Sequence, residues 1–106
     1  MSKSATIIDA DDRLKNPTPG DVLLEDFLKP LGMSQTGLAR ALGVPPRRVN
    51  EIVLGKRAVT ADTDLRLSRY WGSSAGFWLR LQNDHDLMAR GRQIGAILQD
   101  ITPRAA

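Results

Sequence analysis

The sequence predicts an all-α protein, on three observations. Apolar residues recur every three or four positions from residue 20 onward, which is the spacing of amphipathic helices. No segment alternates apolar and polar residues as a half-buried strand does. Glycine, proline or a small hydroxyl residue separates each apolar stretch from the next. A chain of 106 residues, 42% of them hydrophobic, suits one domain of ordinary size.

We expect residues 1–18 to form a flexible tail, because they hold few apolar side chains and end in an Asn-Pro-Thr-Pro run that favours extended backbone. The first helix follows, with leucines spaced at i, i+4 and i+7 between residues 24 and 31. We expect Pro30 and Gly32 to end it, since proline lacks the amide hydrogen that a helix interior needs.

Two short helices follow closely. Ser34 is a suitable N-cap for a helix that runs to Leu42, and Gly43 suits the position just past its end. Pro46 suits the first turn of the next helix, where its missing N–H would be unpaired in any case. We expect that third helix to end near Leu54.

The last part of the chain predicts two more helices. Thr60 should cap a fourth helix to about Trp71, and Ser74 should cap a fifth. Gly91 should interrupt or weaken the fifth helix. A further apolar stripe then forms an additional C-terminal helical segment: Ile94, Ile97, Leu98 and Ile101. We therefore predict a helical domain over residues 19–90 and a C-terminal extension over residues 91–106.

Several classes of function are excluded by residues that the chain lacks. Without cysteine it can have no disulfide, no cysteine-ligated zinc and no thiol nucleophile. The single histidine, His85, leaves no second imidazole for a histidine-based metal site, and we expect no metal ion and no cofactor. No nucleophile and base stand out as a pair, so we expect no enzyme. No run approaches the roughly 20 apolar residues of a membrane span, and we expect a cytoplasmic protein.

Charge divides the chain into unlike parts. Residues 1–30 carry four basic and six acidic side chains, net −2, whereas residues 31–69 carry seven basic and three acidic ones, net +4. Eleven of the 15 cations are arginine, whose planar guanidinium suits phosphates and guanine edges. The middle of the chain is therefore where we expect contact with nucleic acid.

Residues 34–55 show the spacing of a DNA-binding helix-turn-helix. Two helices that cross at about 90–120° through a short turn need a small residue where they touch and glycine in the turn. Ala39 and Gly43 stand at these places, and Val49 takes the matching inward position in the second helix. An ordinary pair of antiparallel helices can show the same residues, so the motif is a hypothesis at this point.

The outer face of the second helix predicts how DNA would be read. With Val49 inward, steps of about 100° per residue turn three polar side chains outward and a fourth to the flank. We predict that these four read bases in the major groove, where Arg suits guanine, Asn suits adenine and Glu suits cytosine: Arg47, Arg48, Asn50 and Glu51. A merely solvated face is the alternative.

Four more residues are predicted to meet the DNA backbone. Gln35 and Thr36 begin the first helix of the motif, where free amide groups attract phosphate. Lys56 and Arg57 follow the second helix, the one predicted to read bases. A solvated turn is an equally good interpretation of Lys56 and Arg57.

Three segments resemble one known family: VPPRRVNEI at residues 44–52, GKRAVTADT at 55–63 and FWLRLQ at 77–82. Residues 19–87 as a whole are similar to HigA-type antitoxins, also called the virulence-associated protein I family, within the XRE helix-turn-helix superfamily. The resemblance implies a five-helix, lambda-repressor-like domain that forms a homodimer and binds a palindromic operator in its own promoter. It also implies that the protein neutralises a small ribonuclease toxin encoded beside it.

The resemblance also assigns residues. The family's base-reading positions correspond to Arg47, Arg48 and Asn50, and its backbone contacts to Lys56 and Arg57. Two other interpretations remain open. One is a repressor of the same fold without a toxin partner, and the other is a protein-interaction module that does not bind DNA.

The two ends of the chain predict further surfaces. Acidic residues near Ile7 and Ile8 would complement a basic ribonuclease, although a leader that only aids solubility fits equally well: Asp9, Asp11, Asp12, Asp21, Glu25 and Asp26. Apolar residues after Ser74 exceed what a five-helix core needs, which predicts a C-terminal dimer interface.

Overall fold

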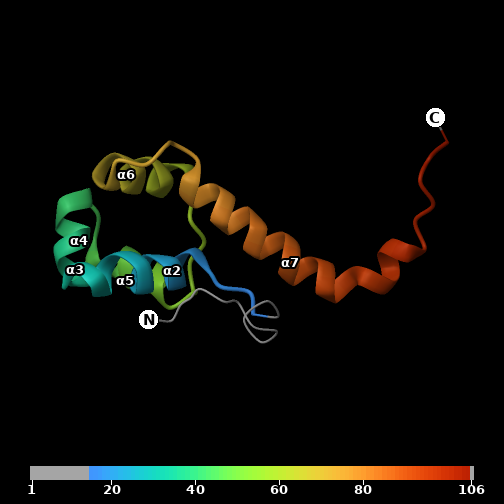
Figure 1. The fold of residues 1–106 in the computed structure, drawn as a ribbon, viewed down its shortest axis with the longest axis horizontal. Helices are drawn as coiled ribbons and strands as arrows, with labels where there is room; N and C mark the ends of the chain where they lie inside the picture. Colours follow the sequence, from blue (N-terminus) through green and yellow to red (C-terminus); the bar gives the residue numbers. More distant parts are fainter. Residues whose placement is uncertain (1–14, 106) are drawn as a thin grey trace.

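The computed structural model describes residues 15–105 and consists of helices joined by short loops, with no strand among these residues (Figure 1). Three consecutive segments form the first helix: α2 (Pro19–Val22), η1 (Leu23–Leu28) and α3 (Lys29–Leu31). Four more helices follow: α4 (Gln35–Leu42), α5 (Pro46–Val53), α6 (Ala61–Trp71) and α7 (Phe77–Gln99). The predicted all-α fold with five helices is confirmed.

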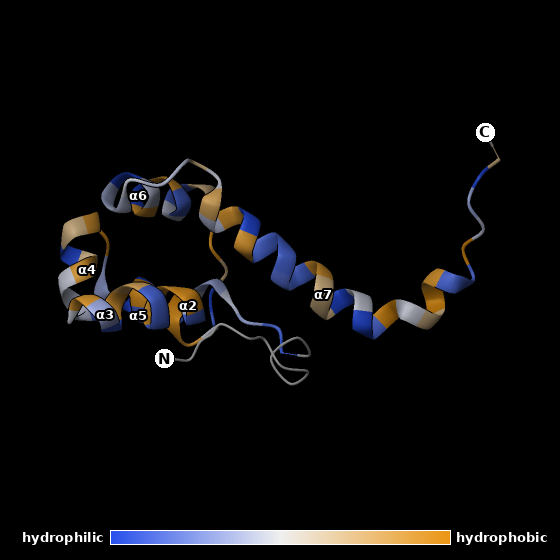
Figure 2. Ribbon diagram, viewed as in Figure 1, coloured by the Kyte–Doolittle hydropathy of each residue, from blue (hydrophilic) through white to orange (hydrophobic). Residues whose placement is uncertain are grey.

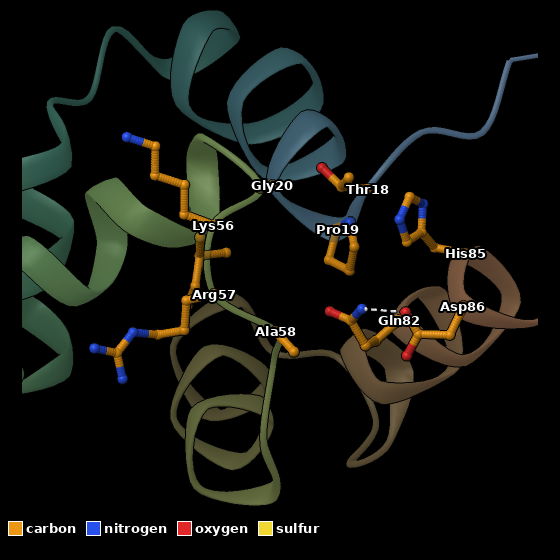
Figure 3. Close-up of a pocket in the computed structure, with 11 residues that line it drawn as sticks. Thr18, Pro19, Gly20, Lys56, Arg57, Ala58, Gln82, His85 and Asp86 are labelled. Atoms are coloured by element: carbon orange, nitrogen blue, oxygen red, sulfur yellow. Dashed lines mark hydrogen bonds between the residues drawn. The ribbon is translucent and has the colours of Figure 1, made fainter. Parts of the chain in front are cut away.

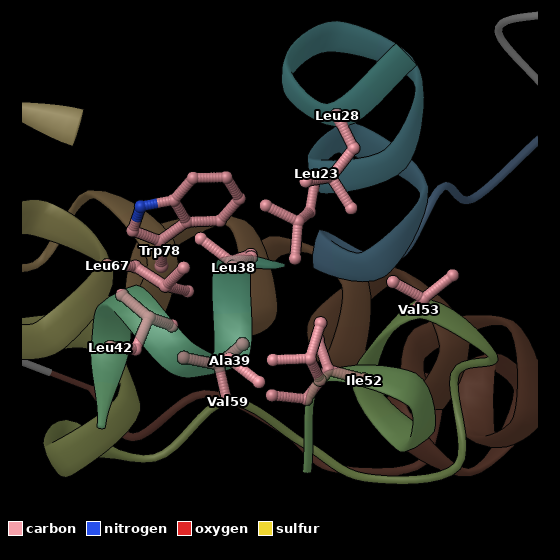
Figure 4. Close-up of a cluster of buried hydrophobic side chains, with 11 residues drawn as sticks. Leu23, Leu28, Leu38, Ala39, Leu42, Ile52, Val53, Val59, Leu67 and Trp78 are labelled. Carbon is pink, nitrogen blue, oxygen red and sulfur yellow. The ribbon is translucent and has the colours of Figure 1, made fainter. Parts of the chain in front are cut away.

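The core lies where α4, α5 and α6 meet the first helix and the start of α7 (Figure 4). Trp78 is fully buried there beside Leu38 and Leu67. The ring of Phe27 lies between two tryptophans, with centroids 5.0 Å from Trp71 and 5.1 Å from Trp78. The other buried apolar residues are Leu23, Leu28, Ala39, Leu42, Val49, Ile52, Val53 and Val59. This core fixes α5 from one side and leaves its other side open.

Pro30 does not end the first helix, contrary to the prediction. The chain widens ahead of it into the π-helical segment η1, and the N–H of Lys29 donates to the carbonyl of Leu24, five residues back. The wider turn takes up the shift in register that a residue without an amide hydrogen requires. The helix ends at Gly32, as was also predicted, and the φ of this glycine, 62°, is left-handed.

The last helix is not interrupted at the predicted position. α7 continues through Gly91, and its departure from helical angles lies at Ile94 (φ −113°, ψ 15°). One glycine costs a helix only about 0.5–1 kcal/mol relative to alanine, which is too little to break a long one. The boundary predicted between residues 90 and 91 therefore falls inside a helix, and the second half of α7 projects away from the body (Figure 1).

Ser74 does not cap α7. The helix begins after Gly76, which is left-handed at φ 94° and provides no side-chain cap. The carboxylate of Asp64, buried in α6, takes that role instead. It accepts the N–H groups of Gly76 at 2.7 Å, Trp78 at 2.8 Å and Leu79 at 3.1 Å. One side chain thereby joins α6 to the start of α7.

The inner end of the predicted tail belongs to the folded domain. The hydroxyl of Thr18 accepts the Asp21 N–H at 3.1 Å, and the Asp21 carboxylate accepts the Thr18 N–H at 2.8 Å. This capping box begins α2. Asn16 Nδ2 donates to the carbonyl of His85 at 2.8 Å and so joins the chain to α7. The rest of the predicted tail, residues 1–14, lies outside the described residues.

Candidate nucleic-acid interface

Helices α4 and α5 form a compact pair around a tight turn. Ser34 caps α4 as predicted, since its hydroxyl accepts the Gly37 N–H at 2.9 Å. Gly43 is left-handed at φ 72°, and the N–H of Val44 donates to the carbonyl of Ala39 at 3.0 Å. Ala39 is fully buried, so no larger side chain fits where the helices touch. The turn chemistry predicted for a helix-turn-helix is therefore present.

α5 turns a polar face to solvent, as the helical spacing predicts. Val49 is buried against the core, whereas the side chain of Arg47 is 83% exposed. Asn50, in the middle of α5, and Leu54, just after its end, are also exposed. A ligand that approaches α5 from solvent would therefore meet its arginines and its asparagine first.

Glu51 joins two of the predicted DNA contacts. Its carboxylate accepts Arg47 Nε at 3.0 Å from the preceding turn and Arg57 Nη2 at 2.7 Å from the loop after the helix. The guanidinium groups of Arg57 and Arg47 hold the pKa of the Glu51 carboxyl below its usual value. Glu51 is thus ionised and doubly paired in the DNA-free protein.

Asp62 pairs in the same way with arginines from two helices. It accepts Arg66 Nε at 2.9 Å within α6 and Arg48 Nη1 at 2.8 Å from α5. Arg66 and Arg48 lower the pKa of the Asp62 carboxyl. Arg66 Nη1 also donates to the carbonyl of Leu42 at 2.8 Å, which ties α6 to the end of α4. Arg48 therefore lies at the flank of the α5 face, held by α6.

One predicted backbone contact touches one predicted base reader. Asn50 Nδ2 donates to Gln35 Oε1 at 3.1 Å, so the first residue of α4 and the middle of α5 meet in space. Thr36 is exposed beside Gln35 at the start of α4. The structure thus brings together the predicted residues of α4, α5 and the following loop on one side of the molecule.

The loop after α5 presents two cations. The N–H groups of Lys56 and Arg57 donate to the carbonyl of Glu51 at 2.8 Å and 3.2 Å, which fixes the turn. Both residues line one end of a cavity of about 220 Å³, and their side chains extend away from Gln82 and His85, which line another part of it (Figure 3). Lys56 and Arg57 are both exposed.

The ion pairs of this surface, those of Asp62 among them, were not predicted from the sequence. The contact between Asp62 and Arg66 has an i,i+4 spacing that a search for helix pairs would find. The contact between Arg48 and Asp62 joins residues 14 apart on different helices, and no local pattern indicates it. Over residues 15–105 there is no group of three or more potential metal ligands, and no helix there is long and apolar enough to cross a membrane.

Comparison with known proteins shows which family has this arrangement of helices. A helix-turn-helix family model matches residues 24–78. Virulence-associated protein I of Dichelobacter nodosus is 54% identical over 69 residues, which cover 65% of this chain and 64% of that relative. A solved structure described as Pseudomonas aeruginosa antitoxin HigA with higBA promoter shares 36% identity with a TM-score of 0.81, and the match covers 86% of this chain and 100% of that one. This chain belongs to the HigA-type antitoxin family.

Another antitoxin has a similar fold. Antitoxin GraA in complex with its operator shares 38% identity and a TM-score of 0.79, over 87% of this chain and 93% of that one. The match to the D. nodosus relative spans slightly less than two thirds of that protein's length. These relatives are antitoxins and regulators of the helix-turn-helix type, which confirms the expectation that the chain is not an enzyme.

Proposed function

We propose that this protein is an antitoxin that represses its own operon in the cytoplasm, by binding operator DNA as a homodimer through the outer face of α5. The observation that carries the proposal is the exposed polar side of α5. The burial of Val49 fixes which side of the helix faces solvent, and Arg47 is exposed on that side. The structures of HigA and GraA with promoter or operator DNA support the same target here.

The contacts divide by chemistry into two sets. We assign base reading to the face of α5, where arginine suits guanine and asparagine suits adenine: Arg47, Arg48 and Asn50. Glu51 lies on the same face as an acceptor-only group that suits a cytosine amine. We assign the DNA backbone to the start of α4 and the loop after α5: Gln35, Thr36, Lys56 and Arg57.

Selection of binding sites from a random duplex library tests the DNA function. The wild-type protein should enrich a palindromic site, with half-sites about 34 Å apart or a multiple of that distance. Arg47→Ala should weaken binding to that site by about 1–3 kcal/mol and relax the preference at one base pair in each half. Arg90→Ala removes the same charge from α7 and serves as control. An unchanged base preference in Arg47→Ala would overturn the assignment of Arg47.

The toxin would meet the acidic first helix. Asp21, Glu25 and Asp26 are exposed on this helix, which contacts α5 at Gly20. A basic ribonuclease needs an acidic complement. The division of charge, net −2 before residue 31 and net +4 over residues 31–69, supports a separation of the two functions.

Deletion of residues 1–14 tests this separation. The deletion stops there because Asn16 and Thr18 hold the start of α2. It should weaken binding to the product of the neighbouring reading frame and leave operator affinity nearly unchanged. Full toxin binding by the shortened protein would show that residues 1–14 are not needed and would leave the exposed acids of the first helix as the toxin contact. A protein that binds DNA but not the neighbouring product would be a repressor without a toxin.

A further inference from the structure

The cations of the proposed DNA face already have anionic partners inside the protein. We propose that Glu51 is a specificity-determining residue that competes with DNA phosphate for Arg47 and Arg57 and so weakens binding to random DNA more than binding to the correct base sequence. The inference rests on the proposed DNA-binding function. In this role Glu51 holds the two arginines and does not bond a cytosine.

The geometry makes Glu51 a shared anchor. Each arginine uses a different carboxylate oxygen: Arg47 Nε donates to Oε2 at 3.0 Å, and Arg57 Nε donates to Oε1 at 2.9 Å. The side chain of Glu51 is 22% exposed, whereas that of Arg47 is 83% exposed. The carboxylate is thus the fixed member of the set, and the arginines are the members that DNA can draw away.

Competition of this kind weakens random binding more than specific binding. On random DNA, Arg47 and Arg57 exchange one anion, the Glu51 carboxylate, for another, a phosphate, and gain mainly the release of counterions. At a correct site, the two terminal nitrogens of Arg47 can bond guanine while Nε keeps its bond to Glu51, so that ion pair need not break. The carboxylate therefore penalises the complexes in which phosphate draws the arginines away from it, which are the complexes that lack the base contact.

The charge of Glu51 can be removed without disturbing the fold. The turn after α5 is held by the main-chain carbonyl of Glu51, which accepts the N–H groups of Lys56 and Arg57. Val49 and Ile52 anchor the helix in the core. Glu51→Gln keeps the size of the side chain and both main-chain bonds, so it isolates the effect of the carboxylate.

The test compares Glu51→Gln with Glu25→Gln. Both variants lose one negative charge, but Glu25 pairs with Lys29 on the first helix at 2.8 Å and touches no predicted DNA contact. Titrations use the site selected by the wild type and a scrambled duplex of the same length, each over a range of salt. Thermal unfolding verifies that both variants fold.

Glu51→Gln should bind scrambled duplex about 3- to 10-fold more tightly than Glu25→Gln, because two exposed ion pairs no longer compete. Its dependence on salt should steepen by about one to two units of log–log slope, roughly one for each arginine that gains a phosphate. Affinity for the selected site should change less, so the ratio of specific to random binding falls.

Other outcomes would overturn the inference in distinguishable ways. If Glu51→Gln loses affinity for the selected site and gains none for scrambled DNA, Glu51 reads a base. If Glu51→Gln and Glu25→Gln behave alike on both duplexes, Glu51 does not restrain the arginines. If the wild-type protein binds no duplex, the proposed function itself fails, and the inference fails with it.

Discussion

Asp64 of α6 accepts the main-chain N–H of Trp78 in α7 at 2.8 Å, and both residues are almost completely buried. The same carboxylate accepts the N–H groups of Gly76 and Leu79. It therefore supplies the N-terminal cap that α7 lacks in its own sequence, and its negative charge suits the positive end of the helix dipole. The contact joins α6 to a residue of α7 that is fully buried in the core.

Asp64→Ala should lower the free energy of unfolding by about 2–4 kcal/mol, because three amide groups at the start of α7 lose their acceptor. Chemical denaturation measures the loss. Asp84→Ala, a change at an exposed position of α7, should stay within about 0.5 kcal/mol of the wild type. Equal stability of the two variants would show that water satisfies these amides and that Asp64 is not the cap.

Gly20 lets the first helix contact α5 directly. A Cβ at this position would clash with the carbonyl of Ile52 and lie 2.8 Å from the Cα of Val53, both of which are main-chain atoms. Gly20→Ala should therefore cost about 1–3 kcal/mol of stability. Gly91→Ala is the matched control, because nothing lies within 4 Å of a Cβ there. It should stabilise α7 by up to about 1 kcal/mol, and the two variants must therefore differ in sign.

Short-range chemistry explains why the helix-turn-helix was predictable. Ser34, Gly43 and Val49 each act within one turn of their own place in the chain, as a cap, a left-handed turn and an inward position. The outward direction of Arg47 and Asn50 follows from Val49 by geometry alone. The parts of the site that depend on such spacing could therefore be read from the sequence.

Contacts between distant residues explain what the sequence did not predict. Asp64 caps a helix that starts 13 residues later, and Asp62 pairs with Arg48 on another helix. Neither aspartate differs in its sequence neighbourhood from an ordinary acidic residue in a first helical turn. The prediction that Pro30 ends the first helix was wrong, because the π-helical turn ahead of Pro30 depends on how the whole first helix packs.

The ion pairs of Glu51 and Asp62 predict a dependence of stability on pH. Arginine partners lower both pKa values in the folded state, from usual values of 4.5 and 3.8. The pairs therefore stabilise the fold above those usual values, and the stabilisation is lost as pH falls through the lowered ones. The double variant Glu51→Gln/Asp62→Asn should melt below the wild type at about pH 6, and the gap should narrow as pH falls below the usual pKa values of 4.5 and 3.8. A gap that does not vary with pH would show that these charges add nothing.

Lys56 and Arg57 should contribute to DNA affinity without contributing to sequence preference. Replacing both by alanine should weaken selected and scrambled duplex alike and reduce the log–log slope against salt by about one to two units. Arg90→Ala/Arg104→Ala removes the same charge from exposed positions near the C-terminus and should leave the slope unchanged. Loss confined to the selected site would show that the loop after α5 reads bases.

The projecting half of α7 predicts where two copies meet. Large apolar side chains are exposed along it and just beyond its end, and Figure 2 shows hydrophobic bands along the same stretch: Leu87, Met88, Ile97, Leu98 and Ile101. The helix-turn-helix cannot supply the interface, because one side of α5 is core and the other is the proposed DNA face. A single α5 reaches only one half-site, so specific binding to a palindrome calls for two copies.

Ile97→Asp/Leu98→Asp should therefore convert a dimer into a folded monomer, because it places two charges where apolar surface would be covered. Sedimentation equilibrium measures the mass, and truncation after Leu87 should give the same result while it keeps the contact between His85 and Asn16. Leu31→Asp is the control, since Leu31 is 64% exposed on α3, outside the proposed interface. The monomer should bind the selected palindrome far more weakly than the dimer but a single half-site about equally, because α5 itself is unchanged. A dimer that survives both the charges and the truncation would place the interface on the body of the domain, where the exposed Leu65 and Tyr70 of α6 border the next apolar hollow.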